Sequence, residues 1–182
     1  METREKILEA AVEVFGWGPS SSLEAVAKKA GITRMTVSRH FKSKDVLLLE
    51  AREYCIDLFQ KVIDEAVASQ QSSIDKLTQI LVNYVPLHSH YIFLIRAVAG
   101  EIEDDGNQRL RKQVASVCQI TEQAKTDGYI RKDFPTAWVS SFLDFIAIGI
   151  GNVKQQGSIA PNETNRIAVE SFLYGCSPKN KA

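Results

Sequence analysis

The sequence lacks most of the patterns that carry redox, disulfide or membrane functions. Its three cysteines, Cys55, Cys118 and Cys176, are far apart and odd in number, so no full disulfide framework is possible, and no CxxC pair suggests zinc or redox chemistry. No run of about eighteen apolar residues occurs, which argues against a membrane span. The charged, amphipathic start of the chain is unlike a secretory signal. We therefore expect a cytoplasmic protein without a membrane partner.

Signatures of the common enzyme classes are absent as well. The sequence has no nucleophile elbow, P-loop, dinucleotide fingerprint or HExxH. His88 and His90, with Glu101 or Cys118, come nearest to a metal set, but side chains two apart on a helix point in different directions. Their segment is expected to be a junction between helices, and Cys118, alone on an apolar stripe, is expected to be buried. We expect no catalysis, no metal and no cofactor.

Charge is balanced overall but segregated along the chain. The 22 basic and 22 acidic residues give a formal net charge of +0. The segment 28–44 nevertheless contains basic residues and no acidic ones: Lys28, Lys29, Arg34, Arg39, Lys42 and Lys44. A local basic patch on a neutral protein favours nucleic-acid binding.

Helical periodicity dominates the chain of 182 residues, which at 45% hydrophobic content can bury a sizeable core. The expected helical segments are 2–16, 23–30, 34–40, 44–69, 73–86, 91–100, a stripe from Leu110 that ends at Gly128, 136–153 and 164–174. We predict an all-α fold with a head, 1–45, and a helical body, 46–182. The long helix from Lys44 is the continuous element that links them.

Two short helices across a tight turn are predicted over residues 23–41. Ala27 is small enough for a close approach of the helices, and Gly31, four residues later, supplies a turn with positive φ. Ile32 and Val37 then fill the wedge between the helices, and Phe41 anchors the far end. Such a helix-turn-helix places its second helix in the DNA major groove. The alternative is an ordinary helical hairpin with a solvated charged face.

Capping residues mark where these helices begin. Ser21 forms a capping-box pattern with Glu24, and Ser22 competes with it as the first cap. Thr33 offers the cap of the second helix.

The stretch FGWG…SSLEAVAKKAGITRMTVSRHFKSKDVLLLEA resembles the N-terminal DNA-binding domain of the TetR family of bacterial transcriptional regulators. The matching positions are Phe15, Gly18, Leu23, Val26, Ala27, Gly31, Thr33, Thr36, His40, Phe41, Lys42, Ser43 and Lys44. The resemblance covers about the first 50 residues; beyond them only the helix order and the connection DGYIRKDFP are similar. It implies a homodimeric regulator that binds a pseudo-palindromic operator in double-stranded DNA and responds to a small molecule, most often as a repressor.

Two positions depart from the family pattern. Pro19 stands where an aromatic residue is usual, and Ser38 stands where the recognition helix commonly has tyrosine. The loss of a long tyrosine contact leaves Arg34 and Arg39 to replace it, which predicts an operator unlike those of well-known members.

The DNA-contacting residues follow from chemistry and from the resemblance together. Hydroxyls, helix N-termini and cations bind phosphates, so the predicted phosphate contacts are Ser22, Thr33, His40 and Lys44. The predicted contacts to base edges are Arg34, Thr36, Ser38 and Arg39.

The body is predicted to hold an effector pocket and a dimer interface. The pocket candidates, chosen for mixed aromatic and polar character, are Phe59, Tyr84, His88, Phe93, Arg96, Cys118 and Phe142, most of which individually fit a core position better. The interface candidates are Leu110, Val114, Val117, Thr121, Ile146 and Ile150, because segment 136–153 is apolar around nearly its whole circumference. The alternative for that segment is the central helix of a monomer.

The sequence as a whole therefore predicts a ligand-responsive, sequence-specific DNA-binding regulator. The alternative from another class is a helical sensor or protein-interaction module that does not act through specific DNA.

Overall fold

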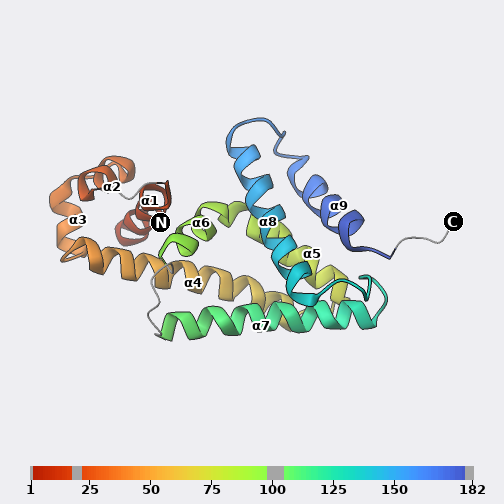
Figure 1. Cartoon of the computed structure of the whole chain (residues 1–182). Coiled ribbons are helices and arrows are strands. Elements are labelled where there is room, and N and C mark those ends of the chain that lie inside the picture. The colour runs from red at the N-terminus through yellow and green to blue at the C-terminus, as the bar shows by residue number, and fades with distance from the viewer. Residues whose placement is uncertain (1, 18–21, 98–104, 179–182) are drawn as a thin grey trace. The chain divides into compact units, whose positions relative to one another are not determined.

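The computed structural model describes residues 2–17, 22–97 and 105–178. Within these ranges the chain forms helices and turns without a strand, which confirms the predicted all-α fold. The helices in chain order (Figure 1) are α1 (Thr3–Trp17), α2 (Leu23–Ala30), α3 (Arg34–His40), α4 (Lys44–Ala68), α5 (Ser73–Tyr84), the 3₁₀ turn η1 (Val85–Leu87), α6 (His88–Ala97), α7 (Asp105–Thr126), α8 (Thr136–Gln155) and α9 (Thr164–Cys176).

The chain divides into two compact units. Unit 1 comprises the described residues of Met1–Leu58 and Ser89–Asn107, and unit 2 those of Phe59–His88 and Gln108–Ala182. Helix α4 contributes its first part to unit 1 and its last part to unit 2. The predicted boundary between the head, 1–45, and the body, 46–182, divides the chain by function rather than by compactness, and it stays a prediction.

Unit 1 is built on the apolar face of α1. Ile7, Ala11 and Phe15 recur at helical spacing and are buried, and α2 packs against this helix through the buried pair Val26 and Ala27. This packing gives the short α2 a fixed support, because a helix of eight residues is not stable alone in water.

A partly buried polar cluster joins three helices of unit 1. The Tyr54 hydroxyl of α4 donates to Glu9 Oε1 of α1 at 2.6 Å, and His90 Nε2 of α6 lies 3.1 Å from Glu9 Oε2. Hydrogen bonding to His90, with a further bond from Tyr54, holds the pKa of Glu9 below its ordinary value against the opposing effect of burial. Burial and the neighbouring carboxylate raise the pKa of Tyr54.

At two positions in unit 2, a side chain from another segment lies so close to a helix that the helix has glycine there. A Cβ at Gly151 of α8 would lie 2.5 Å from the His88 ring, and one at Gly175 of α9 would lie 2.6 Å from the Phe142 ring. Helices α8 and α9 pack side by side in this unit (Figure 1), and the contact of Gly175 with Phe142 lies between them, whereas the contact of Gly151 lies where α8 packs on the segment that ends at His88.

Helix α6 begins earlier than the predicted segment 91–100. Pro86 falls within η1, and proline interrupts an α-helical hydrogen-bond ladder, so α5 ends at Tyr84 and α6 starts at His88. Both His88 and His90 are therefore helical. The predicted junction between helices lies at His88, which is the C-cap of η1 and the first residue of α6, while His90 lies within the first turn of α6.

Helix α8 is long and apolar enough to cross a membrane by length and composition alone. It packs on α5, η1 and α9 within unit 2, and Asp144 lies near its middle. These contacts place α8 among the packed helices of this unit and leave part of its apolar surface uncovered.

Glu9→Gln is expected to lower the free energy of unfolding at pH 7 by about 1–3 kcal/mol, because the charged acceptor of two hydrogen bonds is lost. Since the folded-state pKa of Glu9 lies below its ordinary value of 4.5, this stabilisation is present above that value and is lost as the pH falls through the folded-state pKa. Urea unfolding of the protein and the variant at several pH values between about 3 and 7 measures both effects.

Glu65→Gln is the matched control, since it makes the same chemical change at an exposed position of α4. It should change the free energy of unfolding by less than about 0.5 kcal/mol. Equal losses for the two variants across the pH range would show that the cluster contributes nothing.

Candidate nucleic-acid interface

The turn between α2 and α3 has the geometry that the sequence predicts. Gly31 has φ of 67°, in the left-handed region, and the Ile32 N–H donates to the Ala27 carbonyl at 3.0 Å. Gly31 thus ends α2 and reverses the chain within two residues of the start of α3.

Side-chain caps fix both helix starts. The Ser22 hydroxyl accepts a hydrogen bond from the Ala25 N–H at 3.3 Å, so Ser22 is the N-cap of α2; its competitor Ser21 lies outside the described residues. The Thr33 hydroxyl accepts from the Thr36 N–H at 3.2 Å and caps α3. Each cap satisfies a backbone donor that the helix itself leaves open.

Helix α3 is docked by few residues. Val37 and Phe41 are buried almost completely, as is Ala27 on the facing helix, and Ile32 is half-buried. Burial of a valine and a phenylalanine is worth about 1.5–3 kcal/mol each. The predicted packing between the two helices is confirmed, and the other residues of α3 face solvent.

The predicted base-contacting residues share the exposed part of α3. Arg34, Ser38 and Arg39 are exposed, whereas Thr36 is half-buried and its hydroxyl lies 2.9 Å from that of Thr33. Their side chains remain available to a ligand, with Thr36 the most restricted.

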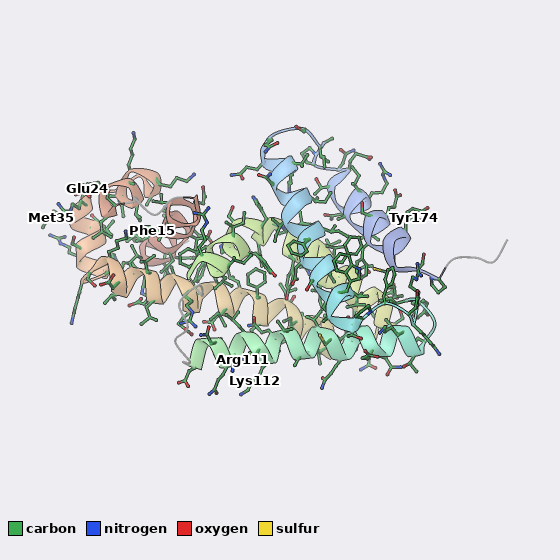
Figure 2. All side chains as sticks on the ribbon, in the orientation of Figure 1. Phe15, Glu24, Met35, Arg111, Lys112 and Tyr174 are labelled. Carbon is green, nitrogen blue, oxygen red and sulfur yellow. The ribbon has the colours of Figure 1, made fainter. Side chains whose placement is uncertain are left out.

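Met35 is a further exposed residue of α3 that is not among the contacts predicted from the sequence. It is 68% exposed and projects from α3 into solvent (Figure 2). Arg39 follows four residues later, so the two side chains are neighbours on the helix surface opposite Val37 and Phe41. The signal in the sequence was the i, i+4 spacing of Val37 and Phe41, which assigns Met35 to the opposite face.

The predicted phosphate contacts lie at the ends of these helices. Ser22, Thr33 and His40 are exposed. Lys44 is half-buried, with its ammonium 5.0 Å from the centre of the Phe15 ring. The lysine stem is therefore supported by an aromatic residue of α1 at the beginning of α4.

The two arginines of α3 differ in their surroundings. Arg34 Nη1 lies 2.9 Å from Glu24 Oε1, whereas Arg39 has no acidic partner in the part of the chain that the structure describes. Hydrogen bonds from its own backbone and from Ser22, and the charge of Arg34, hold the pKa of Glu24 below its ordinary value. Glu24 is therefore a carboxylate beside the basic surface.

The residues predicted for an effector pocket are divided between the two units. Phe93 and Arg96 belong to unit 1; the unit 2 members are Phe59, Tyr84, His88, Cys118 and Phe142. In unit 2, Phe59 and Tyr84 are buried in an edge-to-face pair with centroids 4.8 Å apart. The pocket assignment itself stays a prediction.

The other unit 2 members lie in separate surroundings. Cys118, which was expected to be buried, is half-buried, with its Sγ 3.4 Å from Ser140 Oγ. Phe142 stacks with Trp138 and Phe172. His88 Nε2 is 3.1 Å from Gln155 Oε1. A hollow of about 320 Å³ lies at the α7–α8 connection and is lined by other residues: Gly128, Ile130, Arg131, Lys132, Asp133 and Pro178.

The histidines and cysteines form no metal set within the described ranges, where no three His, Cys, Asp or Glu side chains are arranged to hold an ion. His90 pairs with Glu9 instead. Glu101, considered as a further ligand, lies outside the described residues.

The predicted dimer residues differ widely in exposure. Val117 and Thr121 are buried within the chain, Leu110, Ile146 and Ile150 are half-buried, and Val114 is 57% exposed. Larger exposed apolar side chains lie on α8 and α9, namely Trp138 at 50%, Phe145 at 63% and Tyr174 at 83% (Figure 2 labels Tyr174).

Comparison with known sequences identifies the head. Residues 7–51 match the family described as bacterial regulatory proteins, tetR family. The uncharacterised HTH-type transcriptional regulator TtgW of Pseudomonas putida is 44% identical over 62 residues, which are 31% of this chain and 46% of TtgW. The uncharacterised HTH-type transcriptional regulator YerO of Bacillus subtilis is 26% identical over 128 residues, 67% of this chain and 44% of YerO. The matches thus span less than half the length of these relatives.

Solved structures share the fold over nearly the whole chain. The ketosteroid transcriptional regulator KstR2 of Mycobacterium tuberculosis has a TM-score of 0.76 at 17% identity, covering 98% of this chain and 96% of KstR2. The TetR-like regulator LfrR of Mycobacterium smegmatis, in complex with proflavine, has a TM-score of 0.72 at 18% identity and covers 95% of each chain. Residues 7–51 are thus similar to the tetR family of bacterial regulatory proteins, and the chain as a whole shares the fold of these solved regulators.

Proposed function

We propose that the protein is a sequence-specific DNA-binding transcriptional regulator whose α3 enters the major groove, and that it acts as a repressor released from its operator by a small molecule. The observation that carries the proposal is the docking of α3 by Val37 and Phe41, which leaves Arg39 exposed without an acidic partner among the described residues. An exposed arginine on a rigidly held short helix is suited to a bidentate contact with guanine.

Selection of bound duplexes from a random library, followed by affinity measurements at several salt concentrations, tests the proposal. A regulator enriches a defined sequence, and the logarithm of its binding constant falls linearly with the logarithm of salt concentration. The competing function, a helical module for protein contacts, predicts no enriched sequence and no retention on DNA.

The proposal that a small molecule binds this protein is supported by the aromatic side chains of unit 2. Its aromatic residues include the buried Phe59–Tyr84 pair and the stacked Phe142, which are apolar walls of the kind that small-molecule pockets use. The relative LfrR is described in complex with proflavine, so this fold can hold a small organic molecule. We propose that α4, which belongs to both units, carries the effect of binding to the head.

The dimer proposal rests on the uncovered apolar surface of α8. Trp138 and Phe145 are seven residues apart and hence on one face of the helix. Gly149 continues that face, and a Cβ added to it would meet no atom of the described residues within 4 Å. A second copy that covers this face would bury it, and a two-fold dimer would present two heads to a pseudo-palindrome.

Arg39→Ala is expected to lower the affinity unequally across operator variants, with about 1–3 kcal/mol of discrimination lost at one base pair. Lys44→Ala is expected to lower it on all duplexes and to reduce the salt slope by about one. Titrations of both variants against single-base-pair substitutions of the selected duplex measure this. Equal losses on every duplex for Arg39→Ala would refute its base-reading role.

Met35 is proposed to contact a thymine methyl group, since apolar side chains do so in the major groove. Replacing thymine by deoxyuridine removes that methyl alone, so a substitution in one half-site should weaken binding of the duplex about fourfold. Met35→Ala should bind both duplexes equally, while Met35→Leu should keep the preference. An unchanged thymine preference in Met35→Ala would contradict the contact.

Phe145→Glu is expected to convert a dimer into a monomer, because a charge would be buried in the proposed interface. Analytical ultracentrifugation at micromolar concentration measures the change. Val67→Glu, at a position 52% exposed on α4, is the control and should remain dimeric. A monomeric unmodified protein would refute the dimer.

A further inference from the structure

An ion pair connects the two helices of the helix-turn-helix at their N-terminal ends. Glu24 lies in the first turn of α2, and Arg34 is the first residue of α3. One oxygen of the carboxylate, Oε1, is 2.9 Å from Arg34 Nη1, and both side chains are more than half exposed. Figure 2 labels Glu24 on α2.

The pair engages one edge of the guanidinium. Among the described residues Arg34 has this single acidic partner, at Nη1, so the edge formed by Nε and Nη2 stays open. A guanidinium carries five donors in a rigid planar fork, and one edge suffices for the two acceptors O6 and N7 of guanine. Arg34 can therefore keep Glu24 and bind a base simultaneously.

The Glu24 carboxylate has its own local contacts as well as the pair with Arg34. The charged residues of segment 28–44 are all basic, and the Glu24 carboxylate is a negative charge that lies close to the first residue of α3. The Ser22 hydroxyl, which caps α2, also helps to hold the pKa of Glu24 below its ordinary value. The carboxylate is thus held next to the start of α3 and stays ionised around neutral pH.

We propose that Glu24 is a positioning residue for Arg34: it holds the guanidinium at the start of α3 for a guanine contact and offsets its attraction to phosphates at large. The inference rests on the proposed DNA-binding function and adds a residue that sets specificity. An arginine side chain that is already held by an ion pair loses less conformational entropy when it binds DNA than a mobile one does. This favours a contact with a base, because such a contact requires one particular orientation of the guanidinium. A charge-compensated arginine adds less to sequence-independent binding, which is dominated by phosphate neutralisation.

The test compares base-pair discrimination with overall affinity. Arg34→Gln first identifies the base pair that Arg34 reads, as the position where discrimination disappears. Glu24→Gln should then reduce discrimination at that same pair about three- to tenfold and leave the other pairs unchanged within about twofold. On an unrelated duplex it should bind more tightly, with a salt slope steeper by about one.

Glu13→Gln is the matched control. Glu13 pairs with Lys29 in the same unit, so the variant makes the same chemical change and also releases one cation. It should leave discrimination at every base pair unchanged. In the Arg34→Gln background, Glu24→Gln should produce no further loss of discrimination.

Equal changes on all duplexes for Glu24→Gln, as in the control, would overturn the positioning role while leaving the DNA-binding function intact. A protein that shows no preference among duplexes would overturn the proposed function and this inference together.

Discussion

The burial of Val37 and Phe41 is the interaction on which the proposed DNA-binding surface depends. Helix α3 has seven residues and is too short to persist alone, so these two side chains and the caps at its start give it a fixed position. Once they are buried, the helical repeat dictates which residues face solvent. Met35 and Arg39 lie opposite, with Arg34 and Ser38 on one flank and Thr36 on the other.

The organisation of unit 1 gives this surface a rigid base. Helix α1 buries one face against α2, Lys44 lies over Phe15, and the cluster of Glu9, Tyr54 and His90 ties α1 to α4 and α6. Partly buried polar networks of this kind favour one arrangement, because separating Glu9 from Tyr54 and His90 would cost the hydrogen bonds that its carboxylate accepts. In the proposed function, the same cluster makes α6 a part of the DNA-binding unit.

Much of the fold could be predicted from the sequence because local signals were strong. The bounds of α2 and α3 follow from Ser22, Gly31 and Thr33, residues whose chemistry selects a helix start or end. The start of α6 was missed because an isolated proline signals a break without showing where the helix resumes. The Glu24–Arg34 pair was missed for a different reason: it joins residues ten apart, and only the tight turn brings them together. The partners of His90 and the burial of Thr121 likewise depend on tertiary packing, which periodicity does not specify.

The central claim is that the outward face of α3 meets DNA, and photocrosslinking tests it most directly. A photoreactive amino acid in place of the exposed Lys42, directly after α3 and its Phe41 anchor, would be irradiated with a duplex selected by the protein. The same amino acid in place of the exposed Gln119 of α7 provides the comparison. The account predicts crosslinks from position 42 within each half-site and none from position 119. Crosslinks from position 119 alone, or from neither position despite binding, would contradict it.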